Sequence, residues 1–203
     1  TSPYITVYAF DKVGAAIGAK VSNPASLPSG ANGRCVTFSP DGNYLAVGNN
    51  SGTAAAVEVY AFNSSTGAIG AKVSNPGTAI TGLPNGLTWS QSGAYLAVAH
   101  DTSPFITVYP WSAGFGTKLS DPGTLPTSNG RSIAWRGDDL LILGEASSPY
   151  IHAWAFSSAG FGTKWSNPGA LPAGSLTAVA ITPLGNYVVA AGTTSPYLTS
   201  YPL

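Results

Sequence analysis

Few side chains in this sequence are of the types that perform metal chemistry. The 203 residues include two histidines, His100 and His152, one cysteine, Cys35, and eight acidic residues. A zinc site needs three or four His, Cys or carboxylate ligands brought together, and a calcium loop needs oxygen ligands at short regular spacing. The sequence contains no such cluster. We therefore expect no metal and no other cofactor.

The sequence also lacks the patterns of covalent and acid–base catalysis. It contains no Gly-x-Ser-x-Gly nucleophile turn. The adjacent acids Asp138 and Asp139 lie where we expect a tight turn, a place where acidic residues are common. His152 alternates with apolar residues on an expected strand, so we interpret it as structural. His100 stands beside Asp101 in an expected loop, where it could form a local pair or contact a ligand. The sequence predicts a protein that is not an enzyme.

Composition and charge exclude several classes of partner. Eight basic and eight acidic residues give a net charge of zero, and only 8% of residues are charged. Nucleic-acid binding requires a basic surface, so we expect no nucleic-acid partner. No apolar stretch approaches the ~20 residues that span a bilayer, so we expect a soluble chain without membrane insertion. The 25 Gly and 16 Pro separate short apolar runs, as turns separate strands.

One motif, Lys-x-Ser-(Asn or Asp)-Pro, shows that the elements carrying these residues are repeated. Its four copies occupy residues 20–24, 72–76, 118–122 and 164–168. A period of roughly 40–50 residues, rich in β-branched and aromatic residues, is typical of propeller blades. We expect one all-β domain over residues 1–203, a β-propeller built from four repeats of about 46–51 residues with four strands each. The approximate repeats are 1–35, 36–86, 87–132, 133–178 and 179–203, the first and last incomplete.

Each repeat is expected to hold a hairpin and two further strands. The hairpin joins two apolar runs through a turn such as Pro40-Asp41-Gly42. The next strand has apolar residues on both faces, as a strand between two blades would. The last strand lies around each repeated lysine and ends at Asn-Pro or Asp-Pro, because proline cannot donate to a ladder. Besides these lysine strands, we expect strands near 3–10, 36–38, 44–48, 56–62, 87–89, 95–99, 104–110, 133–135, 140–143, 149–156, 179–181, 187–191 and 196–201.

The sequence Phe-Ser-Pro-Asp-Gly-x-Tyr-Leu-Ala-Val from Phe38, together with the strand Tyr-Ile-Thr-Val-Tyr from Tyr4, resembles WD-repeat-like β-propellers. The resemblance covers essentially the whole chain, although the usual Gly-His and Trp-Asp dipeptides are missing. It implies four strands per blade, a to d from the centre outwards: the hairpin as a and b, the Ser-Pro-Tyr strand as c and the lysine strand as d. The amino-acid sequence of the repeats is also similar to repeats of bacteriophage structural and tail-associated proteins, which implies a virion or extracellular location.

The resemblance further implies where a binding site would lie. In such propellers the b–c and d–a loops gather on one face near the axis, and here these loops differ between repeats while the strands agree. One equivalent position, just before strand a, is occupied by Arg34, Asn85, Arg131 and Thr177. Variable loops on a rigid scaffold commonly carry function. The expected ligand or partner face consists of Arg34, Asn49, Asn50, His100, Asp101, Arg131 and Glu145.

The strand count leaves closure of the ring open. Strand c occurs five times, whereas strands a, b and d occur four times each. The chain could form a four-bladed ring with one terminal strand displaced, part of a propeller with more blades, or an assembly in which a neighbouring chain supplies a strand. An unpaired apolar strand tends to pair with another chain. We therefore expect residues 1–10 or 195–203 at a subunit junction.

These observations predict a non-enzymatic structural or interaction propeller of a phage virion or other extracellular assembly. Its expected partners are further copies of itself or other particle proteins. One alternative is a lactonase-like propeller enzyme, which would need acidic and polar side chains around a metal at the axis. The other is a carbohydrate-binding module that stacks exposed aromatics on a surface glycan, with Trp111, Phe161 and Trp165 as candidates.

Overall fold

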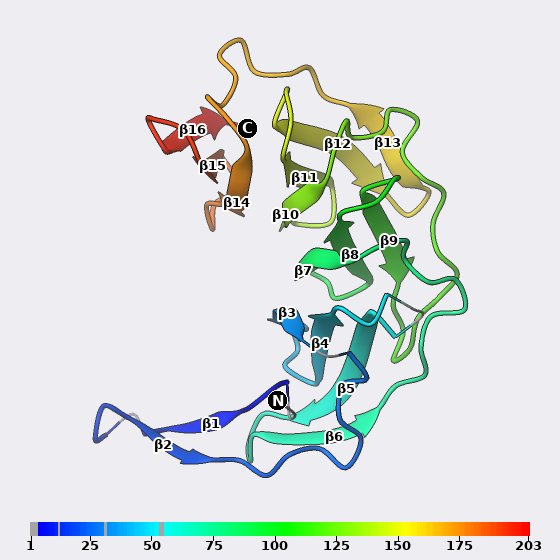
Figure 1. Cartoon of the computed structure of the whole chain (residues 1–203), viewed down its shortest axis with the longest axis vertical. Coiled ribbons are helices and arrows are strands. Elements are labelled where there is room, and N and C mark those ends of the chain that lie inside the picture. Colours follow the sequence, from blue (N-terminus) through cyan, green and yellow to red (C-terminus); the bar gives the residue numbers. More distant parts are fainter. Residues whose placement is uncertain (1–3, 12, 31, 53–54) are drawn as a thin grey trace.

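The computed structural model describes residues 4–11, 13–30, 32–52 and 55–203. Within these ranges every regular element is a β-strand, and the strands form five antiparallel sheets. The sheets follow one another along an open arc, with the first and last sheets at opposite ends (Figure 1). This arrangement confirms the prediction of an all-β, propeller-type fold. Over the described ranges the arc does not close into a ring.

We call the sheets blades 1 to 5 in chain order. Blade 1 has strands β1 (Tyr8–Asp11) and β2 (Ala16–Lys20). Blade 2 has β3 (Gly33–Phe38), β4 (Tyr44–Asn49), β5 (Val57–Asn63) and β6 (Ala68–Lys72). Blade 3 has β7 (Pro84–Trp89), β8 (Tyr95–His100) and β9 (Ile106–Pro110). Blade 4 has β10 (Gly130–Arg136), β11 (Leu140–Glu145), β12 (Ile151–Ser157) and β13 (Gly160–Lys164). Blade 5 has β14 (Leu176–Ile181), β15 (Tyr187–Gly192) and β16 (Leu198–Pro202).

Within each blade the strands are hydrogen-bonded in sequence order. The first strands of blades 2 to 5, namely β3, β7, β10 and β14, lie along the concave side of the arc (Figure 1). Contacts between these inner strands are close: the Ser132 hydroxyl of β10 accepts a hydrogen bond from the Val179 N–H of β14 at 3.0 Å. The order a to d from the centre outwards, implied by the family resemblance, is therefore the order found.

The core consists of apolar clusters between successive blades rather than one central cluster. An aromatic residue at one equivalent position of strand c anchors each cluster, and in the three middle blades it is fully buried: Tyr60, Tyr109 and Trp154. The cluster between blades 3 and 4, for example, joins Val108 of β9 to Leu141 of β11. Each blade is thus held mainly by its neighbours, as in repeat proteins generally.

The outer strand of blade 3 differs from the prediction. Only an isolated bridge between Trp111 and Phe115 forms here, and the segment 112–118, all of it described, contains no strand that runs up to Lys118. Pro110 stands at the place of Ala61 in blade 2 and Ala155 in blade 4. Because proline has no N–H to donate, the ladder between strands c and d is not completed in this blade.

The third strands of blades 3 to 5 begin two residues later than predicted. They start at Ile106, Ile151 and Leu198 rather than at the preceding prolines. The intervening residues have positive φ angles of 67°, 67° and 60°, and each closes a turn by donating its N–H to a loop carbonyl: Phe105 to Thr102, Tyr150 to Ser147 and Tyr197 to Thr194. Similarly, β1 begins only at Tyr8, and residues 1–3 lie outside the described part. No described segment forms a helix that could cross a membrane.

Candidate functional site

A β-bulge opens the inner strand of each of blades 2 to 5. In blade 2, Gly33 pairs with Asn49 and Cys35 pairs with Gly48, so Arg34 is an extra residue between two regular pairs. The same register shift occurs in the other three blades. The extra residues, which we call the bulge row, are Arg34, Asn85, Arg131 and Thr177. Bulges re-aim side chains and are common beside functional sites.

Hydrogen bonds tie the bulge row together across three blades. Arg34 donates from Nε to the Pro84 carbonyl at 2.9 Å and from Nη2 to Oδ1 of Asn85. Asn85 in turn donates from Nδ2 to the Gly130 carbonyl, 2.8 Å away, directly before Arg131. The row is therefore a continuous polar strip along the concave side of the arc.

Arg131 is the second arginine of this strip. Its side chain is exposed and makes no hydrogen bond or ion pair with any residue of the described ranges. It lines a polar hollow of about 330 Å³, together with Asn85, Ser175, Thr177 and Thr193. None of these five side chains is acidic. The hollow thus offers one guanidinium without a partner in the described ranges, together with neutral hydrogen-bonding groups. Asn85, which lines the hollow, accepts a hydrogen bond from the second guanidinium, that of Arg34.

Three of the residues predicted for the binding face are buried inside the blades instead. Asn49, His100 and Glu145 end the second strands of blades 2, 3 and 4, and all three are 0% exposed. Each hydrogen-bonds a polar residue of the neighbouring third strand: Asn49 to Glu58, His100 to Thr107 and Glu145 to His152. The pairs stabilise their own blades and do not reach solvent.

Glu145 shows what such a pair does. His152 donates from Nε2 to Oε1 at 2.6 Å, and the backbone N–H groups of Thr127 and Ser128 donate to Oε2 at 2.8 and 2.9 Å. Burial alone would raise the pKa of Glu145, but these hydrogen bonds and the charge of His152 hold the pKa below its usual 4.5. The Glu145 carboxylate thus links the loop before β10 to the blade, and both of its oxygens already accept hydrogen bonds from the protein.

Glu58 plays the same part in blade 2, although reasoning from the sequence did not single it out. It accepts hydrogen bonds from the backbone and hydroxyl of Ser29, at 3.1 and 3.0 Å, and from Lys72 at 2.5 Å. Alignment of the repeats could have revealed it, because Glu58 and His152 are the two departures from threonine at one position of strand c. Both departures pair with a polar residue at the end of strand b.

The remaining two predicted residues anchor loops. Oδ1 of Asn50 accepts the Asn32 N–H at 2.8 Å, and Oδ1 of Asp101 accepts the Leu83 N–H at 2.7 Å. Burial lowers the pKa of His100 below its usual 6.5, which disfavours the charged imidazole. Of the seven predicted residues, Arg34 and Arg131 therefore lie in the bulge row, and the other five hold blades and loops.

The cysteine and two of the three candidate sugar-stacking aromatics are packed against other side chains. Burial raises the pKa of Cys35 to about 11. Trp111 makes edge contacts with Trp89 and Phe115, and Phe161 makes them with Trp154 and Phe156. Trp165 is 36% exposed. No three His, Cys, Asp or Glu residues of the described part lie together as metal ligands would.

Comparisons with known proteins bear on the fold. No protein-family model and no curated protein sequence matches the chain. Among solved structures, a putative 6-phosphogluconolactonase from Bacteroides uniformis is 18% identical with a TM-score of 0.72, over 97% of this chain and 60% of its own. A chain of a mitotic checkpoint complex is 16% identical with a TM-score of 0.60, over 91% and 52%. The RRP9 WD40 repeats are 13% identical with a TM-score of 0.58, over 84% and 48%. The chain therefore spans about half to three fifths of these structures and shares the fold of WD40-type β-propellers.

Proposed function

We propose that this chain is a non-enzymatic interaction module in which the bulge row binds an acidic segment of a protein partner. The observation that carries the proposal is the row itself. Four equivalent bulges aim Arg34, Asn85, Arg131 and Thr177 along one strip, and the Arg131 side chain has no partner within the described ranges. Arginine suits this task because its planar guanidinium binds a carboxylate through two parallel hydrogen bonds.

The expected binding is weak and sensitive to salt. An exposed arginine–carboxylate pair contributes about 0.2–1 kcal/mol, because water screens the two charges. Two such pairs therefore contribute more to the specificity and orientation of binding than to its affinity. Since the Debye length falls to ~3 Å at 1 M salt, the charge-dependent part of the affinity disappears at high ionic strength.

The hydrogen bonds of the two buried glutamates disfavour an enzymatic function. The carboxylate oxygens of Glu58 and Glu145 already accept hydrogen bonds from groups within the protein. The lactonase-like alternative, for which a structural neighbour also exists, needs acidic and polar side chains around a metal at the axis, whereas the other residues that line the hollow at Arg131 are neutral. Hydrolysis of 6-phosphogluconolactone by the purified chain, lost in Arg131→Ala, would contradict the proposal. A virion or extracellular location stays a prediction from the resemblance of the repeats.

Selection from a peptide library tests the class of partner directly. A random library is displayed and selected on the immobilised chain, and the selected peptides are then measured on the double variant Arg34→Ala/Arg131→Ala. We expect peptides rich in Asp and Glu whose affinity falls about two- to thirtyfold in the variant, as the loss of two exposed pairs of about 0.2–1 kcal/mol each implies. The matched control is Lys118→Ala, which removes a cation already paired with Asp121. Selected peptides that are not acidic, or that bind the double variant equally well, would contradict the proposal.

A further inference from the structure

A second hollow, of about 460 Å³, lies at the opposite end of the inner strands from the bulge row. It is bounded by the last residues of β7, β10 and β14 and by the turns that follow these strands. Its central blade, blade 4, lies between blades 3 and 5 (Figure 1). The volume is in the range of small-ligand sites, about 300–1,000 Å³. Both polar and apolar side chains line it, among them Trp89, Gln91, Trp135, Arg136, Asp139 and Thr182.

The turn of blade 4 departs from the repeat at this hollow. In blades 2, 3 and 5 a hydroxyl closes the turn between strands a and b by accepting the N–H of a tyrosine. The acceptors are Ser39, Ser90 and Thr182, at 2.9, 3.2 and 3.2 Å. Blade 4 has Arg136 at this position, and its turn is one residue shorter. The Arg136 side chain therefore does not close the turn as its counterparts do and is available for another role.

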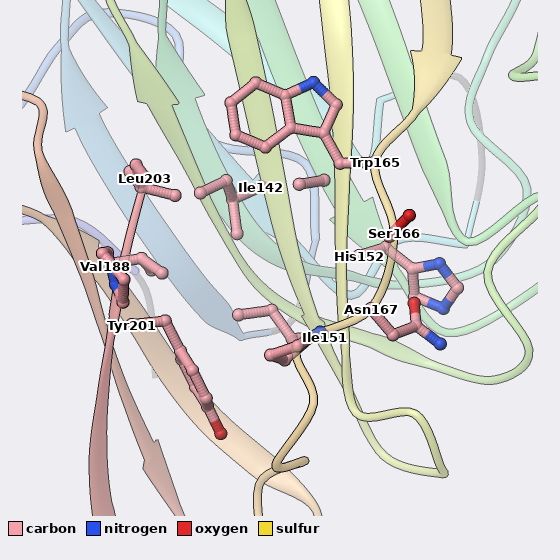
Figure 2. Close-up of a pocket in the computed structure, with 12 residues that line it drawn as sticks. Ile142, Ile151, His152, Trp165, Ser166, Asn167, Val188, Tyr201 and Leu203 are labelled. Atoms are coloured by element: carbon pink, nitrogen blue, oxygen red, sulfur yellow. The ribbon is translucent and has the colours of Figure 1, made fainter.

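Three contacts fix the Arg136 guanidinium at the hollow. It donates from Nε to Oδ1 of Asp139 at 3.2 Å and from Nη2 to Oδ2 at 2.7 Å, and its Cζ lies 5.5 Å from the centre of the Trp165 ring. Figure 2 shows Trp165 beside Ile142 of blade 4, with Leu203 of blade 5 across from them. The ion pair is neutral overall, yet three guanidinium N–H groups and several carboxylate lone pairs are left over. It can thus donate and accept hydrogen bonds at one place.

The turn of blade 3 adds a side-chain amide in a fixed position. The Gln91 N–H donates to the Gly137 carbonyl at 3.1 Å, and the Ser92 N–H donates to Oδ1 of Asp138 at 3.0 Å, so the turns of blades 3 and 4 are joined. The side-chain amide of Gln91 makes no hydrogen bond within the described ranges. It offers both a donor and an acceptor. Since the backbone of both turns is already held, less ordering is needed when a ligand binds.

Two tryptophans complete the lining. Trp89 and Trp135 hold equivalent positions near the ends of β7 and β10. The indole N–H of each is buried and has no hydrogen-bond partner in the part of the chain that the structure describes. A buried N–H without an acceptor is rare, because its lost bond to water is not replaced. The two indoles therefore bring apolar rings and two donors that still lack an acceptor to the hollow.

We infer that this hollow binds a neutral sugar. Sugar hydroxyls both donate and accept, which matches the Gln91 amide and the Arg136–Asp139 pair, and their oxygens are acceptors for the indole N–H groups. The C–H faces of a sugar ring suit the apolar surfaces of Trp89 and Trp135.

Two other classes of ligand fit less well. A charged ligand finds no uncompensated charge, since the charged residues that line the hollow pair with each other. A proline-rich segment offers carbonyl acceptors but few donors, because proline has no N–H. It would leave the Gln91 carbonyl and the Asp139 lone pairs without a donor. Neither arginine of the bulge row takes part, so this inference and the proposed function stand or fall separately.

An array of neutral glycans, acidic glycans and proline-rich peptides tests the inference. We expect the wild type to bind neutral glycans. Binding should weaken about two- to tenfold in Gln91→Ala, which loses a neutral hydrogen bond, and about tenfold or more in Arg136→Ser, which loses charge-assisted ones. Arg136→Ser introduces the residue that blades 2 and 3 have at this position, and circular dichroism checks that it is folded. The control is the double variant Arg34→Ala/Arg131→Ala, which should bind neutral glycans as the wild type does.

An NMR titration with the neutral glycan that binds most strongly locates the site without any substitution. We expect shifts of the indole N–H signals of Trp89 and Trp135 and of the side-chain amide signals of Gln91. The indole signal of Trp154 is the internal control, because its N–H already donates to the Thr124 carbonyl at 3.2 Å. A wild type that binds no neutral glycan or that prefers acidic glycans or proline-rich peptides, equal binding by folded Arg136→Ser, or unshifted Trp89 and Trp135 signals would each overturn the inference.

Discussion

Truncation of the strand-c aromatic should cost very different amounts at equivalent positions of the repeat. Tyr109 is fully buried between blades, and its hydroxyl donates to the Thr78 carbonyl at 2.7 Å. Removing a buried aromatic side chain costs about 3–5 kcal/mol, since apolar contacts are lost and a cavity remains. Tyr109→Ala should therefore lower the free energy of unfolding by about that amount. Tyr60→Ala, at the equally buried position of blade 2, should behave alike.

Tyr8 holds the same repeat position in blade 1 but is 53% exposed, because the described part of that blade has no inner strands. Tyr8→Ala should thus cost less than about 1 kcal/mol, as substitutions at exposed sites do. Tyr201, half-buried in blade 5, should fall between the two. Urea unfolding followed by tryptophan fluorescence measures the series, provided that the m-value is unchanged. Equal losses at Tyr8 and Tyr109 would refute the account of blade packing.

Further predictions concern the buried polar groups and the bulge row. Burial lowers the pKa of His100 below 6.5, so the unfolded chain binds the imidazole proton more tightly than the folded one. The free energy of unfolding should therefore be highest above about pH 6.5 and fall as the pH drops toward the folded-state pKa. Urea titrations at several pH values should show this slope in the wild type and a flatter one in His100→Gln. Cys35, with its pKa raised to about 11, should react with a thiol reagent at pH 8 much more slowly in the folded than in the unfolded protein. Glu145→Ala should destabilise the protein by about 1–3 kcal/mol, because the Thr127 N–H and His152 lose their acceptor, and should speed amide exchange at Thr127. Arg131→Ala should leave the urea midpoint unchanged, since the Arg131 side chain has no partner within the described ranges.

The sequence was sufficient to predict the repeat and most strands, because both signals are local. Strands show as alternating apolar residues, and the repeat shows as turn residues that recur at a fixed period. The hairpin of blade 2 forms around Pro40-Asp41-Gly42, and Gly42 has the positive φ of 72° that its turn requires. The prediction of an outer strand in blade 3 was wrong because of a single residue, Pro110. Its effect depends on which edge of the strand the missing N–H would face, and the sequence does not show this. Ring closure could not be predicted, since it depends on how far each blade rotates against the next.

The candidate site was partly predictable for the same reason. Repeat alignment brought Arg34 and Arg131 to one position, and the structure places both in bulges of the inner strands. The alignment could not show that the ends of the second strands point into the blades. Asn49, His100 and Glu145 are polar residues at loop boundaries, a pattern that in sequence looks like an exposed binding loop. Their burial follows from pairing with strand c, which only the register reveals.

The most direct test of the proposed function is an NMR titration of the isotopically labelled chain with poly-L-glutamate, with a neutral polyserine peptide as the control. We predict salt-sensitive shifts of the amides of Arg34, Asn85, Arg131 and Thr177, absent with polyserine and absent from the double variant Arg34→Ala/Arg131→Ala. Shifts scattered over other lysines and arginines, or equal shifts in the double variant, would contradict the assignment of the bulge row as the binding site.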